Sequence, residues 1–151
     1  MASGNLVLVG ASGWLQPAWR GRFYPDDLPE DWQLSYYNTR FQAVHLPAAF
    51  WQAASPATWA QWLHDTRDGF HFVLEPGDAA SVKPDSERVV LATPAWEAGH
   101  VWWLDEAPDL RQLAQRITQH AADGESLFLF SRCGDLGLLE RVLTLKEVMG
   151  Y

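Results

Sequence analysis

The sequence predicts an α/β protein in which mostly parallel strands alternate with helices. Short apolar runs, typical of buried strands, alternate with stretches whose apolar residues recur at helical spacing. The first run, Leu6–Val9, is apolar at every position, which is typical of a strand buried on both faces. The clearest helical pattern lies between Leu110 and Ala121. A chain of 151 residues suits one domain, residues 1–151, with a sizeable core.

Five apolar runs are expected to form the core strands. Residues that stop a strand follow several of them, such as Gly10 after the first run and Pro47 after the second. The predicted strands are Leu6–Val9, Ala43–Leu46, Phe70–Leu74, Val89–Ala92 and Leu127–Phe130. The run Val101–Leu104 is either a short further strand or an aromatic plug.

Four helices are predicted from apolar stripes and capping residues. Ser55 followed by Pro56 is a strong helix start, because serine caps the first turn and proline fits its first position. Asp135 can cap the last helix in the same way, and Asp123-Gly124 closes the third. The stripes are Leu34, Tyr37 and Phe41, in a helix ending near Arg40; Trp59, Trp62 and Leu63; Leu110, Leu113, Ala114, Ile117 and Ala121; and Leu138, Val142, Leu145 and Met149.

The pattern is weakest between residues 76 and 108. The polar passage Asp78–Arg88 has no periodicity and is predicted to be a loop, and Pro94–Gly99 is predicted to be a turn. No helix is therefore expected to connect the third strand to the fourth.

Charge and composition restrict the possible function classes. A net charge of −8 argues against binding nucleic acid or an anionic membrane, which normally requires a basic face. No segment approaches the ~20 apolar residues of a membrane span, and the N-terminus lacks signal-peptide features, so a cytoplasmic protein is expected. The one cysteine, Cys133, excludes an internal disulfide and a multi-cysteine zinc site.

The opening stretch carries a specific signature. It consists of Gly10-Ala11-Ser12-Gly13-Trp14 and then Trp19-Arg20-Gly21-x-Phe23-Tyr24-Pro25. This signature resembles the start of the YecE-like family, a group of uncharacterised TIM-barrel proteins (domain of unknown function 72). The similarity covers roughly residues 6–75 and 105–151, and it implies a TIM-type barrel.

Two departures from the family pattern accompany this resemblance. An eight-stranded barrel needs ~250 residues, so about three strand–helix units are absent from the middle of this chain. The polar residues that the family has at its strand ends also differ. The family's Glu, Asn, Lys and Asn-Asn correspond here to His45, Pro47, Glu75 and Ser131-Arg132. The resemblance therefore implies a shortened member whose site is rebuilt or lost.

The predicted architecture is an incomplete TIM-type barrel of about five mostly parallel strands. Removing the middle units leaves the strands in the order fourth, fifth, first, second, third, with the helices mainly on one face. The former inner face and two sheet edges would then be uncovered. An aromatic lid of Trp51, Trp96, Trp102 and Trp103, or a second copy of the chain, could cover them, and a homodimer is expected.

The candidate ligand-binding residues follow the strands, where barrels carry their functional groups. A small anionic ligand is the partner considered for them, because the turn after the first strand could present backbone N–H groups and arginines lie nearby. The alternatives are an ordinary turn and arginines paired with Asp26 or Asp27. The candidates are Ser12, Gly13, Trp14, Arg20, Ser131 and Arg132.

His45 and Glu75 are the residues considered for catalysis. Lying on adjacent strands, they could form an acid–base pair, but a histidine hydrogen-bonded in the core or at a dimer interface is favoured. A metal site would need His45, Glu75 and either His71 or Asp78, and Cys133 has no identifiable base as a nucleophile. No metal or cofactor is therefore expected.

The sequence favours a protein of unknown biochemical activity, a catalytically degenerate YecE-like protein that acts in binding or interaction. The alternative is a small-molecule enzyme acting on a phosphorylated or sugar-like substrate at the carboxyl ends of the strands. A third possibility is a structural subunit that offers its open sheet face to another protein.

Overall fold

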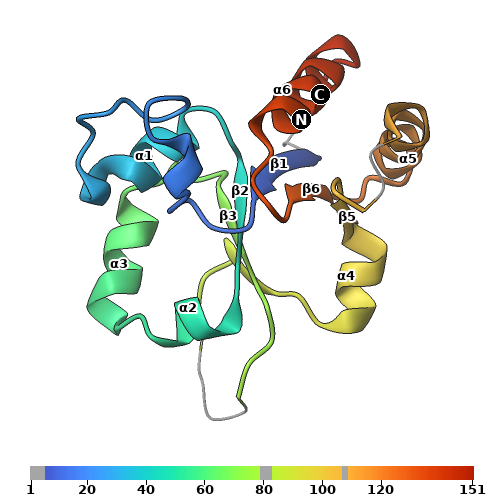
Figure 1. Ribbon diagram of the computed structural model, residues 1–151. Coiled ribbons are helices and arrows are strands. Elements are labelled where there is room, and N and C mark those ends of the chain that lie inside the picture. Colours follow the sequence, from blue (N-terminus) through green and yellow to red (C-terminus); the bar gives the residue numbers. More distant parts are fainter. Residues whose placement is uncertain (1–5, 79–82, 107–108) are drawn as a thin grey trace.

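The strands form two three-stranded parallel sheets at the centre of the molecule (Figure 1). The computed structural model describes residues 6–78, 83–106 and 109–151. One sheet has the order β1-β6-β5, formed by Val7–Ala11, Leu127–Ser131 and Val101–Trp103. The other has the order β2-β3-β4, formed by Ala43–Leu46, His71–Leu74 and Val89–Leu91. All four strand pairs are parallel, which confirms the predicted α/β class.

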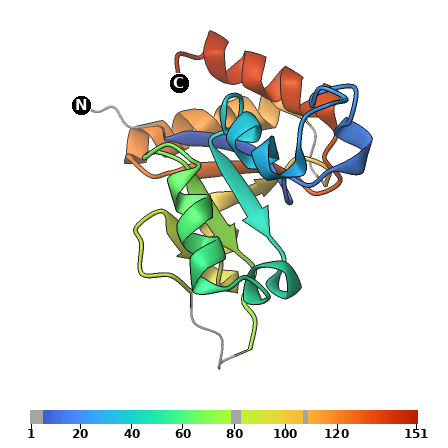
Figure 2. The same ribbon diagram turned by 90° about the vertical axis from the view of Figure 1, so that its left-hand side faces the viewer.

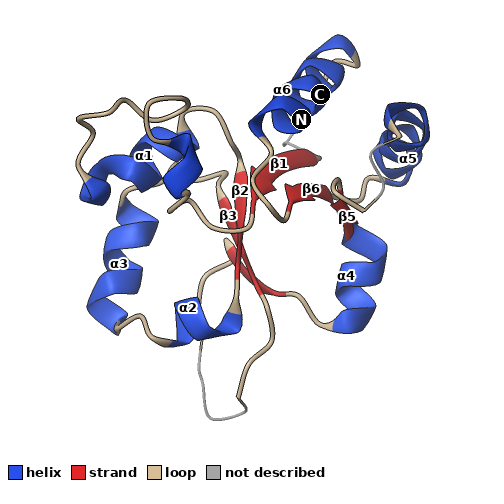
Figure 3. Cartoon of the chain, in the orientation of Figure 1, coloured by secondary structure: helices blue, strands red, loops and turns tan. Residues whose placement is uncertain are grey.

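Helices flank the central strands to the left and to the right in the view of Figure 3. The capping signals work as predicted: Ser55 Oγ accepts from Thr58 N at 3.1 Å, and Asp135 Oδ1 accepts from Leu138 N at 3.1 Å. In the described ranges, no helix is long and apolar enough to cross a membrane. The helices are α1 (Gln33–Asn38), α2 (Ala48–Gln52), α3 (Pro56–His64), α4 (Pro94–His100), α5 (Leu110–Asp123) and α6 (Leu136–Val148), with 3₁₀ turns η1 (Pro17–Trp19) and η2 (Glu30–Trp32).

The segment predicted to be a turn, Pro94–Gly99, is instead the helix α4. Thr93 caps this helix by accepting from Trp96 N, and Pro94 occupies its first turn, so the start signal matches that of α3. The run after it is the strand β5. Helix α2, directly after β2, was not predicted. Part of the predicted loop Asp78–Arg88 lies outside the described residues.

The predicted strand order is correct for two neighbouring pairs and wrong for the fourth strand. β6 pairs with β1, and β3 pairs with β2, as expected. β4 pairs with β3 and not with β6, and β5 occupies the place beside β6, with Trp102 opposite Leu129. Strands that follow one another along the chain usually lie side by side, and β4 obeys this tendency. Helix α4 then carries the chain from one sheet to the other.

A tyrosine hydroxyl separates the two sheets where β1 meets β2. Tyr37 Oη accepts from Ala11 N at 2.8 Å and donates to Ala43 O at 2.6 Å, so it stands in for a direct bond between the strands. Direct bonds continue on either side, from Gln42 N to Val9 O at 3.0 Å and from Gly13 N to His45 O at 2.8 Å. The two sheets therefore meet along a seam that is bonded partly through a side chain.

The apolar side chains form two cores. The larger core packs α1, α3, α5 and α6 against one face of the strands, and Figure 2 shows α3 (green) in front of the sheets. A smaller inner core lies on the other face. Its members come from both sheets and from the residue after β4: Leu8, Ala43, Val73, Ala92, Val101, Phe128 and Phe130. Trp96 of α4 and Trp103 of β5 pack against them.

This inner core corrects the expectation of an uncovered face. Its seven buried members are at most 8% exposed, so side chains of the same chain fill the space. Of the four tryptophans proposed as a lid, Trp96 and Trp103 pack here, whereas Trp51 and Trp102 pack against the larger core. The homodimer remains a prediction, but this face no longer supplies a physical reason for it.

Candidate functional site

The carboxyl ends of β1, β2, β5 and β6 gather a small polar cluster. Ser12 Oγ lies 3.2 Å from Nδ1 of His45, and Ser12 N donates to Ser131 O at 3.1 Å. The ring of Trp103 meets the His45 ring edge-on with centroids 5.0 Å apart. We call Ser12, His45, Trp103, Ser131 and Arg132 the strand-end cluster. Parallel strands bring these residues together because their carboxyl ends share one edge.

The turn after β1 does not offer the N–H groups that the sequence suggested for an anion. The N–H of Ser12 donates to Ser131 O, and the N–H of Gly13 donates to His45 O. Gln16 Nε2 donates to Ser12 O at 2.9 Å, which holds the turn from its other side. Gly13 has a φ of 85°, a conformation that favours glycine. The backbone hydrogen bonds of this turn therefore connect the end of β1 to β6 and to β2.

His45 is a neutral, buried histidine. Its side chain is 4% exposed, and burial lowers its pKa to about 4. The negative charge of Glu75 opposes this shift, and the positive charge of Arg132 adds to it. Near neutral pH the imidazole therefore carries one proton and can either donate to or accept from Ser12 Oγ. This placement matches the favoured interpretation of a hydrogen-bonded core histidine.

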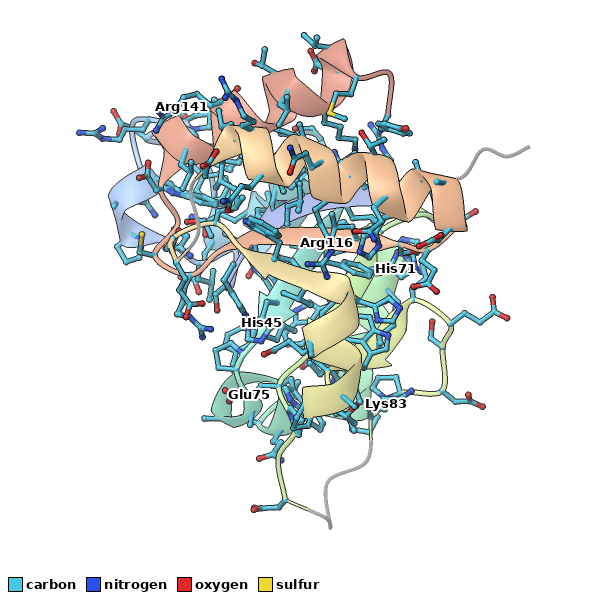
Figure 4. The ribbon with its side chains drawn as sticks, turned by 90° about the vertical axis from the view of Figure 1, so that its right-hand side faces the viewer. His45, His71, Glu75, Lys83, Arg116 and Arg141 are labelled. Carbon is cyan, nitrogen blue, oxygen red and sulfur yellow. The ribbon has the colours of Figure 1, made fainter. Side chains whose placement is uncertain are left out.

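Glu75 has a different partner from His45, although both residues lie at the same edge (Figure 4). Glu75 Oε1 accepts from Ala48 N at 2.9 Å, at the start of α2. Its backbone O accepts from Trp51 Nε1 at 2.8 Å. No direct hydrogen bond joins the side chains of His45 and Glu75, although the Glu75 charge acts on the pKa of His45.

An aspartate after β5 organises the loop after β6. Ser131 Oγ donates to Asp105 Oδ1 at 2.8 Å, and Cys133 N donates to Asp105 Oδ2 at 2.8 Å. Partial burial opposes ionisation of Asp105, but these hydrogen bonds outweigh it and lower the pKa. Ser131 Oγ also accepts from Asp135 N at 2.9 Å. The hydroxyl of Ser131 is thus engaged internally.

The remaining N–H donors of the cluster belong to the side chains of Arg132 and Trp103. The Arg132 guanidinium lies 3.8 Å from the centroid of the Trp103 ring, a cation–π contact. Its ion pair with Glu106 spans 3.8 Å between side chains that are 55% and 66% exposed. Trp103 Nε1 is buried and has no hydrogen-bond partner among the described residues. A buried donor without an acceptor is rare in native proteins.

The side chains of two predicted ligand residues, Trp14 and Arg20, lie outside the strand-end cluster. The Trp14 side chain is buried in the larger core, edge-on to Phe50 and Trp62 at 5.4 and 5.0 Å. Arg20 donates to the backbone O of Asp26 at 2.8 Å, so it pairs with the carbonyl rather than with the predicted carboxylate. The structure brings together Ser12, Ser131 and Arg132, but not the side chains of Trp14 and Arg20.

Sequence reasoning did not single out Trp103 and Asp105 as parts of this cluster. Both follow from the assignment of β5, which the sequence left open between a strand and an aromatic plug. Once that strand is placed beside β6, Asp105 stands after a strand end just as Ser12 does. Within the described ranges, no group of three or more His, Cys, Asp or Glu side chains is arranged to hold a metal ion.

We expect the burial of His45 to make the protein less stable in mild acid. Between pH 6.5 and about 4 the unfolded chain binds a proton that the folded chain excludes, so stability falls as pH falls. The shift corresponds to roughly 3 kcal/mol, present in full above pH 6.5 and lost below about pH 4. Urea unfolding across this pH range measures it.

The His45→Gln variant serves as the comparison for this pH dependence. Burial also lowers the pKa of His71, which contributes in the same direction and is retained in His45→Gln. The difference between the two stability curves therefore isolates His45. Curves that run parallel from pH 7 to pH 4 would show that His45 is protonated as readily in the folded state.

The fold and the strand-end cluster define an α/β protein of parallel strands with a polar site at their carboxyl ends. The chain belongs to the family described as "Protein of unknown function DUF72", whose family model matches residues 8–93, more than half of its length. This membership confirms the resemblance seen in the opening signature.

A crystal structure of a DUF72 family protein from Thermotoga maritima is similar to this chain at 20% sequence identity and a TM-score of 0.42. The alignment covers 97% of this chain and 54% of that one, so this chain spans about half the length of that relative. No curated protein sequence gives a significant match.

Proposed function

We propose that this protein binds a small anionic ligand at the strand-end cluster and is catalytically degenerate. The observation that carries the proposal is the Arg132 guanidinium, which is 55% exposed and stacks 3.8 Å from the centroid of the Trp103 ring, whose buried Nε1–H lacks an acceptor among the described residues. A carboxylate or phosphate oxygen forms charge-assisted hydrogen bonds with such an exposed guanidinium. Ser12 Oγ, beside neutral His45, offers a further polar contact.

Arg132 is the cationic side chain of the strand-end cluster, and its guanidinium is the group that attracts an anion. Burial is the main cause of the low pKa of His45; the negative charge of Glu75 opposes the shift, and the positive charge of Arg132 adds to it. The Glu106 carboxylate is only loosely engaged at 3.8 Å and is 66% exposed, so it can be displaced. The Glu75 carboxylate is held at the start of α2 by Ala48 N.

Binding without catalysis is favoured because the groups that would transfer protons are occupied. The Glu75 carboxylate caps α2, and the Asp105 carboxylate holds the loop after β6. A second candidate is an enzyme acting on a phosphorylated or sugar-like substrate. It is favoured by one observation, the 3.2 Å contact between Ser12 Oγ and a neutral histidine.

The finer architecture that accompanies this proposal is an incomplete TIM-type barrel. All observed strand pairs are parallel, and backbone hydrogen bonds link β1 to β2 across the seam. The cluster lies at the carboxyl ends of these strands, where barrels carry their ligand sites. The shared larger core, which spans Val7 to Leu143, is consistent with one domain.

Thermal unfolding in inorganic phosphate tests the binding proposal. We expect phosphate to raise Tm at constant ionic strength, by an amount equivalent to roughly 2.7 kcal/mol at about 100 times Kd. Arg132→Gln should remove most of this increase, because the cationic anchor is lost. Arg141→Gln is the matched control, since this exposed arginine lies on α6, at the opposite end of the view in Figure 4 from Glu75.

Two outcomes would contradict the proposal. Equal Tm increases in Arg132→Gln and Arg141→Gln would show that phosphate acts without the cluster. Release of nitrophenol from nitrophenyl phosphate by the wild-type protein, lost in Ser12→Ala, would favour the enzyme instead.

A further inference from the structure

A groove on the helical side of the molecule lies away from the strand-end cluster. It has a volume of about 960 Å³ and runs between η2 with α1 on one side and α3 on the other. Figure 2 shows this side of the molecule, with α3 (green) below α1 (light blue). Ser35 Oγ donates to Asp65 O at 3.2 Å, which joins the two walls at one point. The space is large enough for a small organic molecule.

Aromatic rings that pack against one another line the groove. Trp14, which is 4% exposed, packs edge-on against both Phe50 and Trp62. Phe50 and Trp62 stack at 5.5 Å with planes 4° apart. Trp32 stands at the rim with 65% of its surface exposed. Leu15, which is 40% exposed, also lines the groove, so two exposed large hydrophobic side chains border this hollow.

The charged residues that line the groove are all acidic. Glu30, Asp31 and Asp65 line it, and no lysine, arginine or histidine does. The ion pairs found within the described part of the chain involve Glu140, Glu147 and Glu106 instead. The three groove carboxylates therefore lack a cationic partner there, in a protein that already carries a net charge of −8. This charge disfavours an anionic ligand and attracts a cation.

The geometry points to a linear polyamine as the ligand of this groove. Its methylene segments lie along the partly exposed Phe50 and Trp62, and its ammonium groups lie near the carboxylates and over the face of Trp32. A chain with apolar segments between charges matches an aromatic lining with acidic residues at its margins. A neutral sugar would use the rings but leave the three carboxylates unneutralised. The inference is independent of the anion site.

Calorimetric titration with spermidine at fixed ionic strength tests the inference. We expect saturable one-to-one binding that weakens about tenfold or more in the double variant Glu30→Gln/Asp31→Asn. Trp32→Ala should also weaken it. These side chains are exposed, so the variants should keep the wild-type Tm. Asp123→Asn, an exposed acid at the end of α5, is the matched control and should leave spermidine affinity unchanged.

Three results would overturn the inference. Spermidine affinity that is equal in Glu30→Gln/Asp31→Asn and Asp123→Asn would reduce the binding to non-specific attraction by net charge. The absence of any saturable heat with spermidine would leave the groove without the proposed ligand. Binding of a neutral oligosaccharide that is lost in Trp32→Ala but kept in Glu30→Gln/Asp31→Asn would identify a sugar site instead.

Discussion

Substituting Gly10 with alanine should destabilise the protein by about 4 kcal/mol or prevent its folding. A Cβ built on Gly10 would lie 1.8 Å from Ala43 O and 2.5 Å from the Tyr37 hydroxyl. The carbonyl belongs to the backbone of β2 and cannot rotate away as a flexible side chain would. The strands would have to separate at the seam, which breaks the hydrogen bonds that Tyr37 makes on both sides.

Urea unfolding followed by tryptophan fluorescence measures this effect, with Gly99→Ala as the control. A Cβ on Gly99 would meet nothing within 4 Å, and Gly99 lies in α4. Alanine is the better helix former there, so the control should be neutral or more stable by up to about 1 kcal/mol. A Gly10→Ala protein as stable as Gly99→Ala would mean that β1 and β2 do not approach as closely as described.

Removing the hydroxyl of Tyr37 should cost about 4 kcal/mol of stability. The ring is fully buried, and Tyr37→Phe would leave Ala11 N and Ala43 O without their partner. Each unsatisfied buried group costs roughly 2 kcal/mol, and the space is too closed for water to replace the hydroxyl readily. Burial also raises the pKa of Tyr37 well above its usual value, so the hydroxyl remains a donor at any ordinary pH.

Tyr36→Phe is the matched control for Tyr37→Phe. The two tyrosines are neighbours in α1, but Tyr36 is only half-buried and its hydroxyl has no hydrogen bond within the described ranges. We expect the control to change the free energy of unfolding by less than about 0.5 kcal/mol. Equal stabilities of the two variants would contradict a bridging role for the Tyr37 hydroxyl.

The elements with strong local signals could be predicted from the sequence. Ala43–Leu46 is a strand with the predicted bounds, because an apolar run meets Pro47 there. The starts of α3 and α6 follow from Ser55 and Asp135, whose side chains bond the first turn as capping residues do. Helix α4 was missed although Thr93-Pro94 gives a similar signal, since its seven residues show no long apolar stripe.

The candidate site could be predicted in its location but not in its hydrogen bonds. The strand ends identify Ser12, Ser131 and Arg132, because parallel strands share a carboxyl edge. The partner of each polar group depends on side chains distant in the sequence. Asp105, for example, lies 26 residues before Ser131, and Arg132 stacks on Trp103 only because β5 lies beside β6.

The sequence by itself determined the alternation of strands and helices, the family and the strand ends where polar residues gather. These features depend on local patterns of apolar, capping and turn residues. The tertiary structure alone decided that β4 pairs with β3, that the strands divide into two sheets, and that an inner core fills the space between them. The physical reason is that strand pairing and core packing depend on contacts between groups that are distant in the sequence. The Tyr37 hydroxyl, for example, forms hydrogen bonds with both β1 and β2.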